Sequence, residues 1–195
     1  MSKLQIPVDY TPLLNLKQTE LGIKSIKDFF QANLSSELRL RRVTAPLFVE
    51  SGTGINDDLN GVERPVRFPI KDMDDRNAEI VHSLAKWKRY ALKKYGFKPD
   101  EGLYTDMNAI RRDEELDNIH SIYVDQWDWE KIITRDERTT DTLKNTVREI
   151  YKTLKHTEKY MSIQYDYITE FLPEDIFFIT SQELLDRYPN LTPKE

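Results

Sequence analysis

The sequence predicts an α+β protein in which a mostly antiparallel sheet is flanked by helices. Apolar residues recur at helical spacing in two long segments, 16–34 and 140–161, whereas the segments 103–111 and 120–130 alternate as strands do. Only the short acidic segment 112–119 separates the two alternating segments. A connection this short joins antiparallel strands, so we expect these two segments to pair as an antiparallel hairpin.

The bulk composition fits one cytoplasmic domain. The chain has 195 residues, of which 38% are hydrophobic and 32% charged, and this is enough to build a core. The net charge of −5 gives no reason to expect nucleic acid as a partner. The absence of cysteine excludes disulfides and thiolate metal sites and suits a reducing compartment. Residues 1–10 have no apolar run and so form no secretory signal, and no segment approaches the roughly 18 apolar residues of a membrane span.

The first 48 residues predict an N-terminal arm, a helix and a strand. Residues 1–16 have two prolines and no clear period, and we expect an N-terminal arm before a domain at 17–195. Residues 16–34 have the apolar spacing of an amphipathic helix. The segment Leu38–Phe48 then predicts a strand that ends near Pro46, because proline removes a donor from the ladder.

The next elements lead into a second helix. The polar, glycine-containing segment 51–60 predicts a loop, and 63–70 and 78–81 predict strands. Ser83 is the expected N-cap of the following helix, and Gly96 is expected to end it. Most lysines and arginines of this helix fit a solvated face.

The last third contains the clearest helix, at 140–161. The apolar run Asp175–Thr180 predicts a buried strand. Ser181 is expected to cap a short helix over 182–188, which Pro189 stops.

Three runs carry the candidate chemistry, namely 81–89, 102–112 and 120–130. In an extended strand, side chains alternate between faces, so Val124, Gln126 and Asp128 lie on one face and Asp125 on the other, where a structural role is expected. A glutamine and a carboxylate two residues apart can hold a small polar ligand together. The alternative is a half-exposed strand with ordinary polar residues.

These runs closely resemble the type A asparagine synthetases, the ammonia-dependent, AMP-forming aspartate–ammonia ligases. Val81–Arg89 resembles one hallmark of that family and Tyr123–Glu130 a second, and the segments 54–61 and 181–189 also match. The resemblance runs from about Gln18 to Glu195. Family members continue well beyond this point, and the glycine-rich third motif with its arginine is absent from the chain.

The resemblance implies a catalytic core like that of class II aminoacyl-tRNA synthetases, with its C-terminal part missing. The long first helix and the strand that ends at Pro46 resemble the first motif of those enzymes, which forms a dimer interface, so a homodimer is implied. The implied reaction converts L-aspartate, ammonia and ATP to L-asparagine, AMP and pyrophosphate through β-aspartyl-adenylate. The chain alone is expected to be inactive.

The resemblance also assigns the nucleotide side of the site. Ile110–Asp113 resembles the core of the second synthetase motif, with Asp113 where many synthetases carry glutamate. Arg111 is the implied catalytic cation at the α-phosphate; its alternative role is an ion pair with Asp113 or Glu114 at the loop rim. The nucleotide contacts implied by the resemblance are Arg111, Asp113, His120, Ser121 and Val124. Val124 departs from the aromatic residue usual at its position, which argues against base stacking there.

The substrate side is assigned in the same way. Lys88 is the implied catalytic and binding cation for the aspartate carboxylate. Gln126 would supply an amide donor for a carboxylate, and Asp128 an acid for an ammonium group. Asp57 matches a substrate-binding aspartate, and only the resemblance separates it from adjacent Asp58. Ser83, with Lys86 a weaker candidate, completes the substrate group, although Ser83 could serve only as a cap and Lys86 could simply be solvated.

ATP is the expected cofactor, with Mg²⁺ carried by its phosphates. No protein metal site is expected, because His82, His120 and His156 are far apart in sequence. Two rival functions stay open: an aspartate-type aminoacyl-tRNA synthetase core, and a non-catalytic paralogue that dimerises or binds a metabolite.

Overall fold

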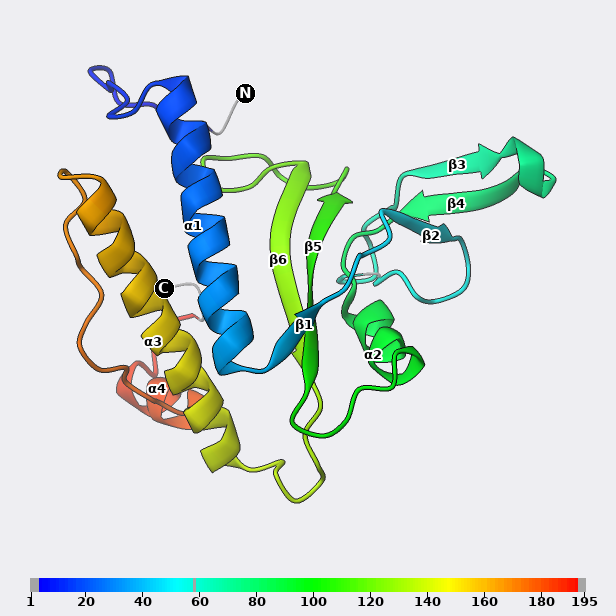
Figure 1. Ribbon diagram of the computed structural model, residues 1–195. Helices are drawn as coiled ribbons and strands as arrows, with labels where there is room; N and C mark the ends of the chain where they lie inside the picture. Colours follow the sequence, from blue (N-terminus) through cyan, green and yellow to red (C-terminus); the bar gives the residue numbers. More distant parts are fainter. Residues whose placement is uncertain (1–3, 58, 193–195) are drawn as a thin grey trace.

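A three-stranded sheet with helices on both faces forms the body of the protein. The computed structural model describes residues 4–57 and 59–192 (Figure 1). The sheet has the order β1-β5-β6, from Leu40–Arg42 (β1), Gly102–Ile110 (β5) and Tyr123–Lys131 (β6). β5 and β6 are antiparallel, as predicted, with Thr105 opposite Asp128, and β1 runs parallel to β5.

The helices Leu16–Glu37 (α1) and Thr140–Gln164 (α3) pack together on one face of this sheet (Figure 1). Trp127 and Trp129 of β6 point to that face and pack against Leu34 and Leu38. The short helix Ala85–Lys94 (α2) packs on the opposite face, where Met107 and Leu103 of β5 are buried. The alternation of β6 therefore separates an apolar face under α1 from a mixed face under α2, as the sequence predicts.

A second sheet carries the connection between β1 and α2. It has the order β2-β4-β3, from Phe48–Glu50 (β2), Arg67–Ile70 (β3) and Arg76–Ile80 (β4), and is antiparallel throughout. A 3-10 turn, Lys71–Met73 (η1), joins β3 to β4. β4 leads directly to α2, so this sheet fixes where α2 begins.

The long elements form where they are predicted, with ends that differ by up to three residues: α1 and α3 each continue three residues further, and β6 begins three residues later. α1, α2, α3 and the β5–β6 hairpin are confirmed, and Gly96 follows the end of α2 with a φ of 72°, as a helix-ending glycine does. Within the ranges that the structure describes, no helix is long and apolar enough to cross a membrane.

Three local predictions are wrong. Leu38–Phe48 is not one strand: β1 ends at Arg42, and Phe48 begins β2 in the other sheet, beyond Pro46. Asp175–Thr180 forms no strand, and Phe177 there is 73% exposed. A strand needs a hydrogen-bonded neighbour, and the described residues offer none to this segment. Thr180, one residue earlier than Ser181, caps the last helix, Ser181–Arg187 (α4), through a capping box with Glu183.

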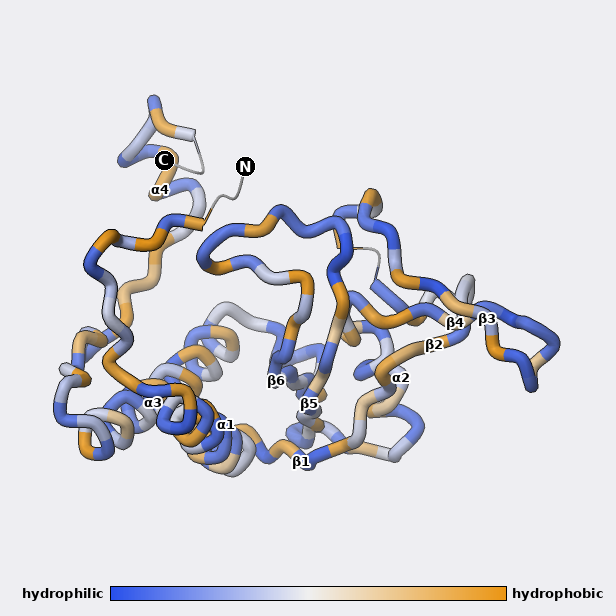
Figure 2. The backbone as a smooth tube through the Cα atoms, turned by 90° about the horizontal axis from the view of Figure 1, so that it is seen from above, coloured by the Kyte–Doolittle hydropathy of each residue, from blue (hydrophilic) through white to orange (hydrophobic). Residues whose placement is uncertain are grey.

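The segment that leads to α4 crosses α3 rather than joining a sheet. Tyr151 and Lys155 of α3 donate to the backbone carbonyls of Pro173 and Leu172, and Phe178 lies against Lys144 and Arg148. Figure 2 shows α4 set apart from both sheets, with apolar residues along the segment before it. This part of the chain contributes nothing to the candidate site.

Candidate functional site

Lys88 occupies a nearly closed position between α2 and β6. Its side chain is 4% exposed, and its Nζ lies 2.6 Å from Oδ1 of Asp128 and 3.7 Å from Oε2 of Glu130. The same Nζ donates to the carbonyl of Trp129 at 3.1 Å. A buried ammonium needs such partners, because without them its desolvation would be strongly unfavourable. The structure therefore brings together two side chains that the sequence places 40 residues apart.

Asp57 lies at the N-terminus of α2. Its Oδ2 accepts from the Ser83 hydroxyl at 2.9 Å and from the Ala85 backbone N–H at 3.0 Å. Its Oδ1 lies 3.7 Å from Nζ of Lys86. A carboxylate here satisfies a free helix N–H and interacts favourably with the helix dipole.

The predicted N-cap of α2 is therefore corrected. Leu84, not Ser83, occupies the N-cap position and makes no side-chain bond to the helix. The Ser83 hydroxyl lies 3.4 Å from the Ala85 nitrogen and donates to Asp57, so the carboxylate from the 51–60 loop supplies the closer cap. Sequence alone could not show this, because the two residues are 26 positions apart. Asp58, the alternative to Asp57, lies outside the described residues.

The substrate-side residues lie close to one another. Ala85 and Lys88 are separated by less than one helical turn, about 4.5 Å of rise. Gln126 precedes Asp128 by two positions on the same face of β6, about 7 Å away. Asp57 and Ser83 meet at the start of α2, and Lys88 of the same helix meets Asp128 of β6, whose face also carries Gln126. Together these residues supply a cation, two acids, a hydroxyl and an amide.

Arg111 continues β5 at its far end. Its backbone N–H donates to the Ile122 carbonyl at 2.8 Å, and its side chain is 31% exposed. Its closest acid is Glu114, whose Oε2 lies 4.0 Å from Nη1, so the rim pair is long. The Nε is buried and has no hydrogen-bond partner among the described residues. The guanidinium therefore keeps donor capacity for a ligand.

Asp113 has a different partner from the one that its sequence neighbours suggest. Arg64 binds it through Nη2 at 2.5 Å and through its backbone N–H at 2.8 Å. The Arg64 hydrogen bonds hold the pKa of Asp113 well below its ordinary value. This contact ties the β5–β6 loop to the segment before β3, a structural role that sequence reasoning missed.

The other residues predicted to contact the nucleotide, His120, Ser121 and Val124, each have separate surroundings. His120 Nδ1 lies 2.8 Å from Asp117 Oδ1, and the backbone N–H of Ile119, together with His120, lowers the pKa of Asp117. Ser121 is exposed. Val124 packs against the buried cluster of Val81, Leu84, Met107 and Ala109, so it already has a role in the core.

The predicted substrate-side residues and Arg111 lie on the same face of the sheet but at different positions along its strands. Thr105 stands opposite Asp128, and Arg111 lies six residues further along the chain, which is about 20 Å in extended backbone. Arg111 has the same parity as buried Thr105, Met107 and Ala109, so it continues the face that α2 covers. An elongated ligand on this face could contact both groups.

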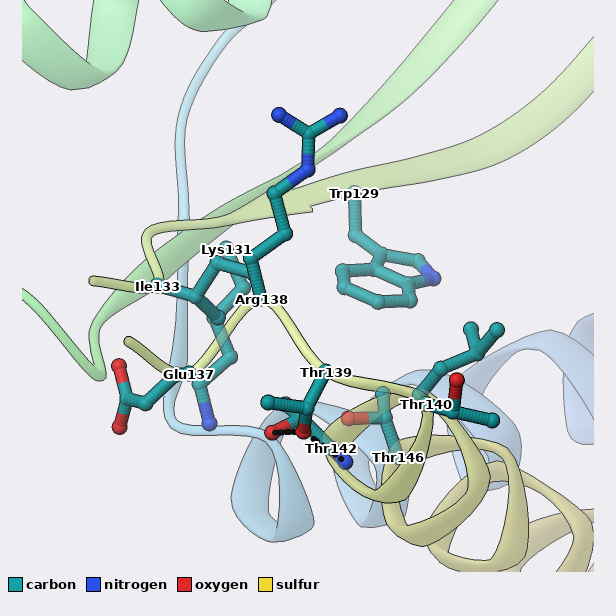
Figure 3. Close-up of a pocket in the computed structure, with 10 residues that line it drawn as sticks. Trp129, Lys131, Ile133, Glu137, Arg138, Thr139, Thr140, Thr142 and Thr146 are labelled. Atoms are coloured by element: carbon teal, nitrogen blue, oxygen red, sulfur yellow. Dashed lines mark hydrogen bonds between the residues drawn. The ribbon is translucent and has the colours of Figure 1, made fainter. Parts of the chain in front are cut away.

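Two open cavities lie elsewhere. One, of about 500 Å³, lies between the end of β6 and the start of α3 and is lined by Trp129, Lys131, Arg138 and several threonines (Figure 3). The other, of about 650 Å³, lies along α3 between Arg148 and Ile176. Neither of these two cavities is lined by a predicted site residue.

Glu130 is a site neighbour that sequence reasoning missed. It lies between two cations, with Oε1 3.4 Å from Nε of Arg89 and Oε2 3.7 Å from Lys88. Its parity on β6 matches that of Asp128, and this signal could have identified it.

The fold resembles that of a solved protein structure. The structure is similar to that of an asparaginyl-tRNA synthetase from Entamoeba histolytica, with a TM-score of 0.57 and 9% sequence identity, over 89% of this chain and 36% of that one. At this identity the likeness concerns the fold alone. The α+β architecture is that of a class II aminoacyl-tRNA synthetase-like core.

Sequence comparison identifies the family. Residues 17–195 match the model of the aspartate-ammonia ligase family, and the chain belongs to that family. It is 65% identical over 195 residues to an aspartate–ammonia ligase of Clostridium perfringens strain SM101 and 60% identical over 195 residues to one of Ruminiclostridium cellulolyticum. An aspartate–ammonia ligase of Bacteroides thetaiotaomicron is 62% identical over 194 residues. These matches cover all of this chain but 56–58% of each relative.

Proposed function

We propose that this chain supplies the aspartate site and part of the nucleotide site of an aspartate–ammonia ligase. The observation that carries the proposal is the buried Lys88–Asp128 pair, whose lysine lies on the helix that Asp57 caps, in a chain that matches the family from residue 17 onward. The reaction would convert L-aspartate, ammonia and ATP to L-asparagine, AMP and pyrophosphate. By itself, the chain would bind aspartate without completing the reaction.

The substrate-side charges complement aspartate. L-Aspartate presents two carboxylates and one ammonium, and the site presents Lys88 and Gln126 for carboxylates and Asp128 and Asp57 for the ammonium. In the free protein Lys88 and Asp128 neutralise each other at 2.6 Å. A zwitterion can replace each partner with an equivalent one, so binding need not leave a buried charge unpaired.

Activation would proceed toward Arg111. An oxygen of the aspartate β-carboxylate attacks the α-phosphorus of ATP, the bond to the β-phosphate breaks, and pyrophosphate leaves. Arg111 would compensate the negative charge that builds on the α-phosphate oxygens. Ammonia then attacks the acyl carbon, loses a proton, and displaces AMP. The backbone of Asp113, His120 and Ser121 would line the nucleotide, with the Val124 side chain beside it.

Magnesium would arrive with the nucleotide. Among the described residues, no three histidines or acids are grouped so that they could hold a metal ion. The ligands of Mg²⁺ would be largely phosphate oxygens of the nucleotide. No step above depends on a protein-bound metal.

The assembly would be a cytoplasmic homodimer, with residues 1–16 as an arm and 17–195 as part of the catalytic domain. Apolar side chains on the outer surface of α1 support the dimer: Leu16 is 88% exposed and Leu21 57%. Exposed apolar surface of this kind favours burial against a second copy.

The direct test is a chimera in which this chain replaces the matching part of the C. perfringens ligase, to which it is 65% identical. The chimera should form asparagine and AMP in equal amounts when aspartate, ATP and ammonium are supplied. A chimera that folds but produces neither would contradict the proposal. Transfer of aspartate to tRNA without asparagine formation would favour the synthetase alternative.

A further inference from the structure

Asn56 is buried immediately before Asp57, and its side chain binds three groups outside its own loop. It is 4% exposed. Its amide donates to Oε1 of Glu79 at 3.1 Å and, at 3.4 Å, to the Ile80 carbonyl. Its Oδ1 accepts from the backbone N–H of His82 at 2.8 Å. These contacts join the 51–60 loop to β4 and to the segment that opens α2.

The Glu79 partner of Asn56 is itself held as an anion. Its side chain is 8% exposed, and its Oε2 accepts from Nε of Arg67 at 3.1 Å. Burial raises the pKa of Glu79, but the hydrogen bonds from Asn56 and Arg67 outweigh it and leave that pKa below its ordinary value. The Asn56 amide therefore donates to a carboxylate, and such charge-assisted bonds are stronger than neutral ones.

The glycine-containing part of the loop is exposed and lies between Ser51, whose N–H donates to the Asn77 carbonyl at 2.9 Å, and Asn56. Gly52 and Gly54 adopt positive φ values of 79° and 73°, and the residues from Gly52 to Gly54 are exposed. Asn56 is the buried residue within the described part of the loop. Without its contacts, the carboxylate of Asp57 would be held at α2 only by its hydrogen bonds from Ser83 and Ala85 and by its 3.7 Å ion pair with Lys86.

We propose that Asn56 is a positioning residue that fixes Asp57 at the N-terminus of α2 and so prepares the aspartate site. The part that concerns aspartate rests on the proposed function. The position needs a donor toward Glu79 and an acceptor toward His82 in one short side chain, and asparagine supplies both. Aspartate there would place a second carboxylate against Glu79, whereas leucine would leave both partners unsatisfied.

The test compares Asn56→Asp with the double variant Asn56→Asp/Glu79→Gln, which restores the bond with donor and acceptor exchanged. Asn60→Asp, on the exposed part of the same loop, is the matched control. Asp57→Ala removes the acceptor of the Ala85 N–H and so gives the exchange rate of that amide without its hydrogen bond. Asn56→Ala replaces Asn56→Asp if the added buried charge prevents folding. All variants are made in the 195-residue chain.

Two readouts separate positioning from general stability. Hydrogen exchange of the Ala85 amide, which donates to Asp57, reports where the carboxylate lies. Calorimetry with L-aspartate and, separately, with ATP reports the site. Asn56→Asp should speed Ala85 exchange toward the Asp57→Ala rate and raise the aspartate Kd by about tenfold to hundredfold, as expected for a lost bond to a charged group, with the ATP Kd unchanged. The double variant should recover both values, and Asn60→Asp should change neither.

Each other outcome is decisive. If Ala85 exchange is unchanged in Asn56→Asp and in Asn56→Ala, the positioning role is overturned. The same holds if Asn60→Asp speeds Ala85 exchange and weakens aspartate binding as much as Asn56→Asp does. Faster exchange with an unaltered aspartate Kd would overturn its connection to the substrate. If the unaltered chain binds no aspartate, the proposed function fails, while Ala85 exchange still decides whether Asn56 positions Asp57.

Discussion

At the scale of single residues, the candidate site depends on a balance of buried charge. Lys88 is charged and almost fully enclosed, and Asp128, Glu130 and the Trp129 carbonyl satisfy it. The resemblance identified Lys88, Gln126 and Asp128, and strand parity placed the last two on one face. No local pattern could show that α2 presents Lys88 to Asp128, because that contact depends on how the helix packs across β5 and β6.

Asp128 should matter for aspartate more than for ATP. In the chimera, Asp128→Asn removes the charge that pairs with an ammonium, and we expect the aspartate KM to rise by about tenfold to hundredfold while the ATP KM changes little. Asp125→Asn is the matched control, since Asp125 lies on the opposite face and pairs with Lys27 at 2.9 Å. Equal effects of the two substitutions, or a selective loss of ATP affinity, would show that the roles are wrongly assigned.

Arg111 should act on the chemical step. Arg111→Ala in the chimera leaves the α-phosphate charge uncompensated, so we expect aspartate-dependent exchange between ATP and pyrophosphate to fall by roughly two to three orders of magnitude. Arg112→Ala, one position further into the loop, serves as the comparison. Exchange near the unaltered rate in Arg111→Ala would remove Arg111 from the nucleotide site.

At the scale of elements, long periodic segments could be predicted and short ones that depend on partners could not. The β5–β6 hairpin, α1 and α3 follow from local spacing. Asp175–Thr180 has the composition of a strand, but composition cannot supply a hydrogen-bonded neighbour, and Phe178 lies against α3 instead. The cap of α2 was misassigned for a related reason, since its acceptor comes from a distant loop.

The Arg64–Asp113 contact should stabilise the β5–β6 loop in a pH-dependent way. The pKa of Asp113 is lowered in the folded state, so its contribution is fully present well above the ordinary value of 3.8 and is lost as the pH falls below that value. Urea titrations at neutral pH should show Asp113→Asn to be less stable than the unaltered chain, and the difference should shrink in strong acid. A difference that stays constant from neutral to acid pH would contradict the ionic role.

At the scale of the whole molecule, the arrangement of two sheets around α2 was only partly predictable. The class II-like core follows from the resemblance, and the strands predicted at 63–70 and 78–81 overlap β3 and β4. The separate β2-β4-β3 sheet does not follow, because the segment of β2 was assigned to the end of the strand Leu38–Phe48. The Asn56–Glu79 contact, 23 positions apart in sequence, had no local signal either. Contacts of this range emerge only when the second sheet forms.

The isolated chain should self-associate. Phe171 and Phe177 are 82% and 73% exposed, and Leu16 and Leu21 add apolar surface on α1. Such surface favours association in water. Light scattering over a concentration series should show species larger than a monomer, and Phe171→Ser/Phe177→Ser should reduce their size. A monodisperse monomer at all concentrations would refute this expectation.

The central claim, that the buried Lys88 site takes aspartate, is tested most directly by aspartate titration of ATP–pyrophosphate exchange in the chimera. Lys88→Ala is compared with Lys93→Ala, an exposed lysine on the same helix. We predict that Lys88→Ala abolishes exchange or requires far more aspartate, whereas Lys93→Ala retains the unaltered dependence. Equal aspartate dependence in the two variants would contradict the account.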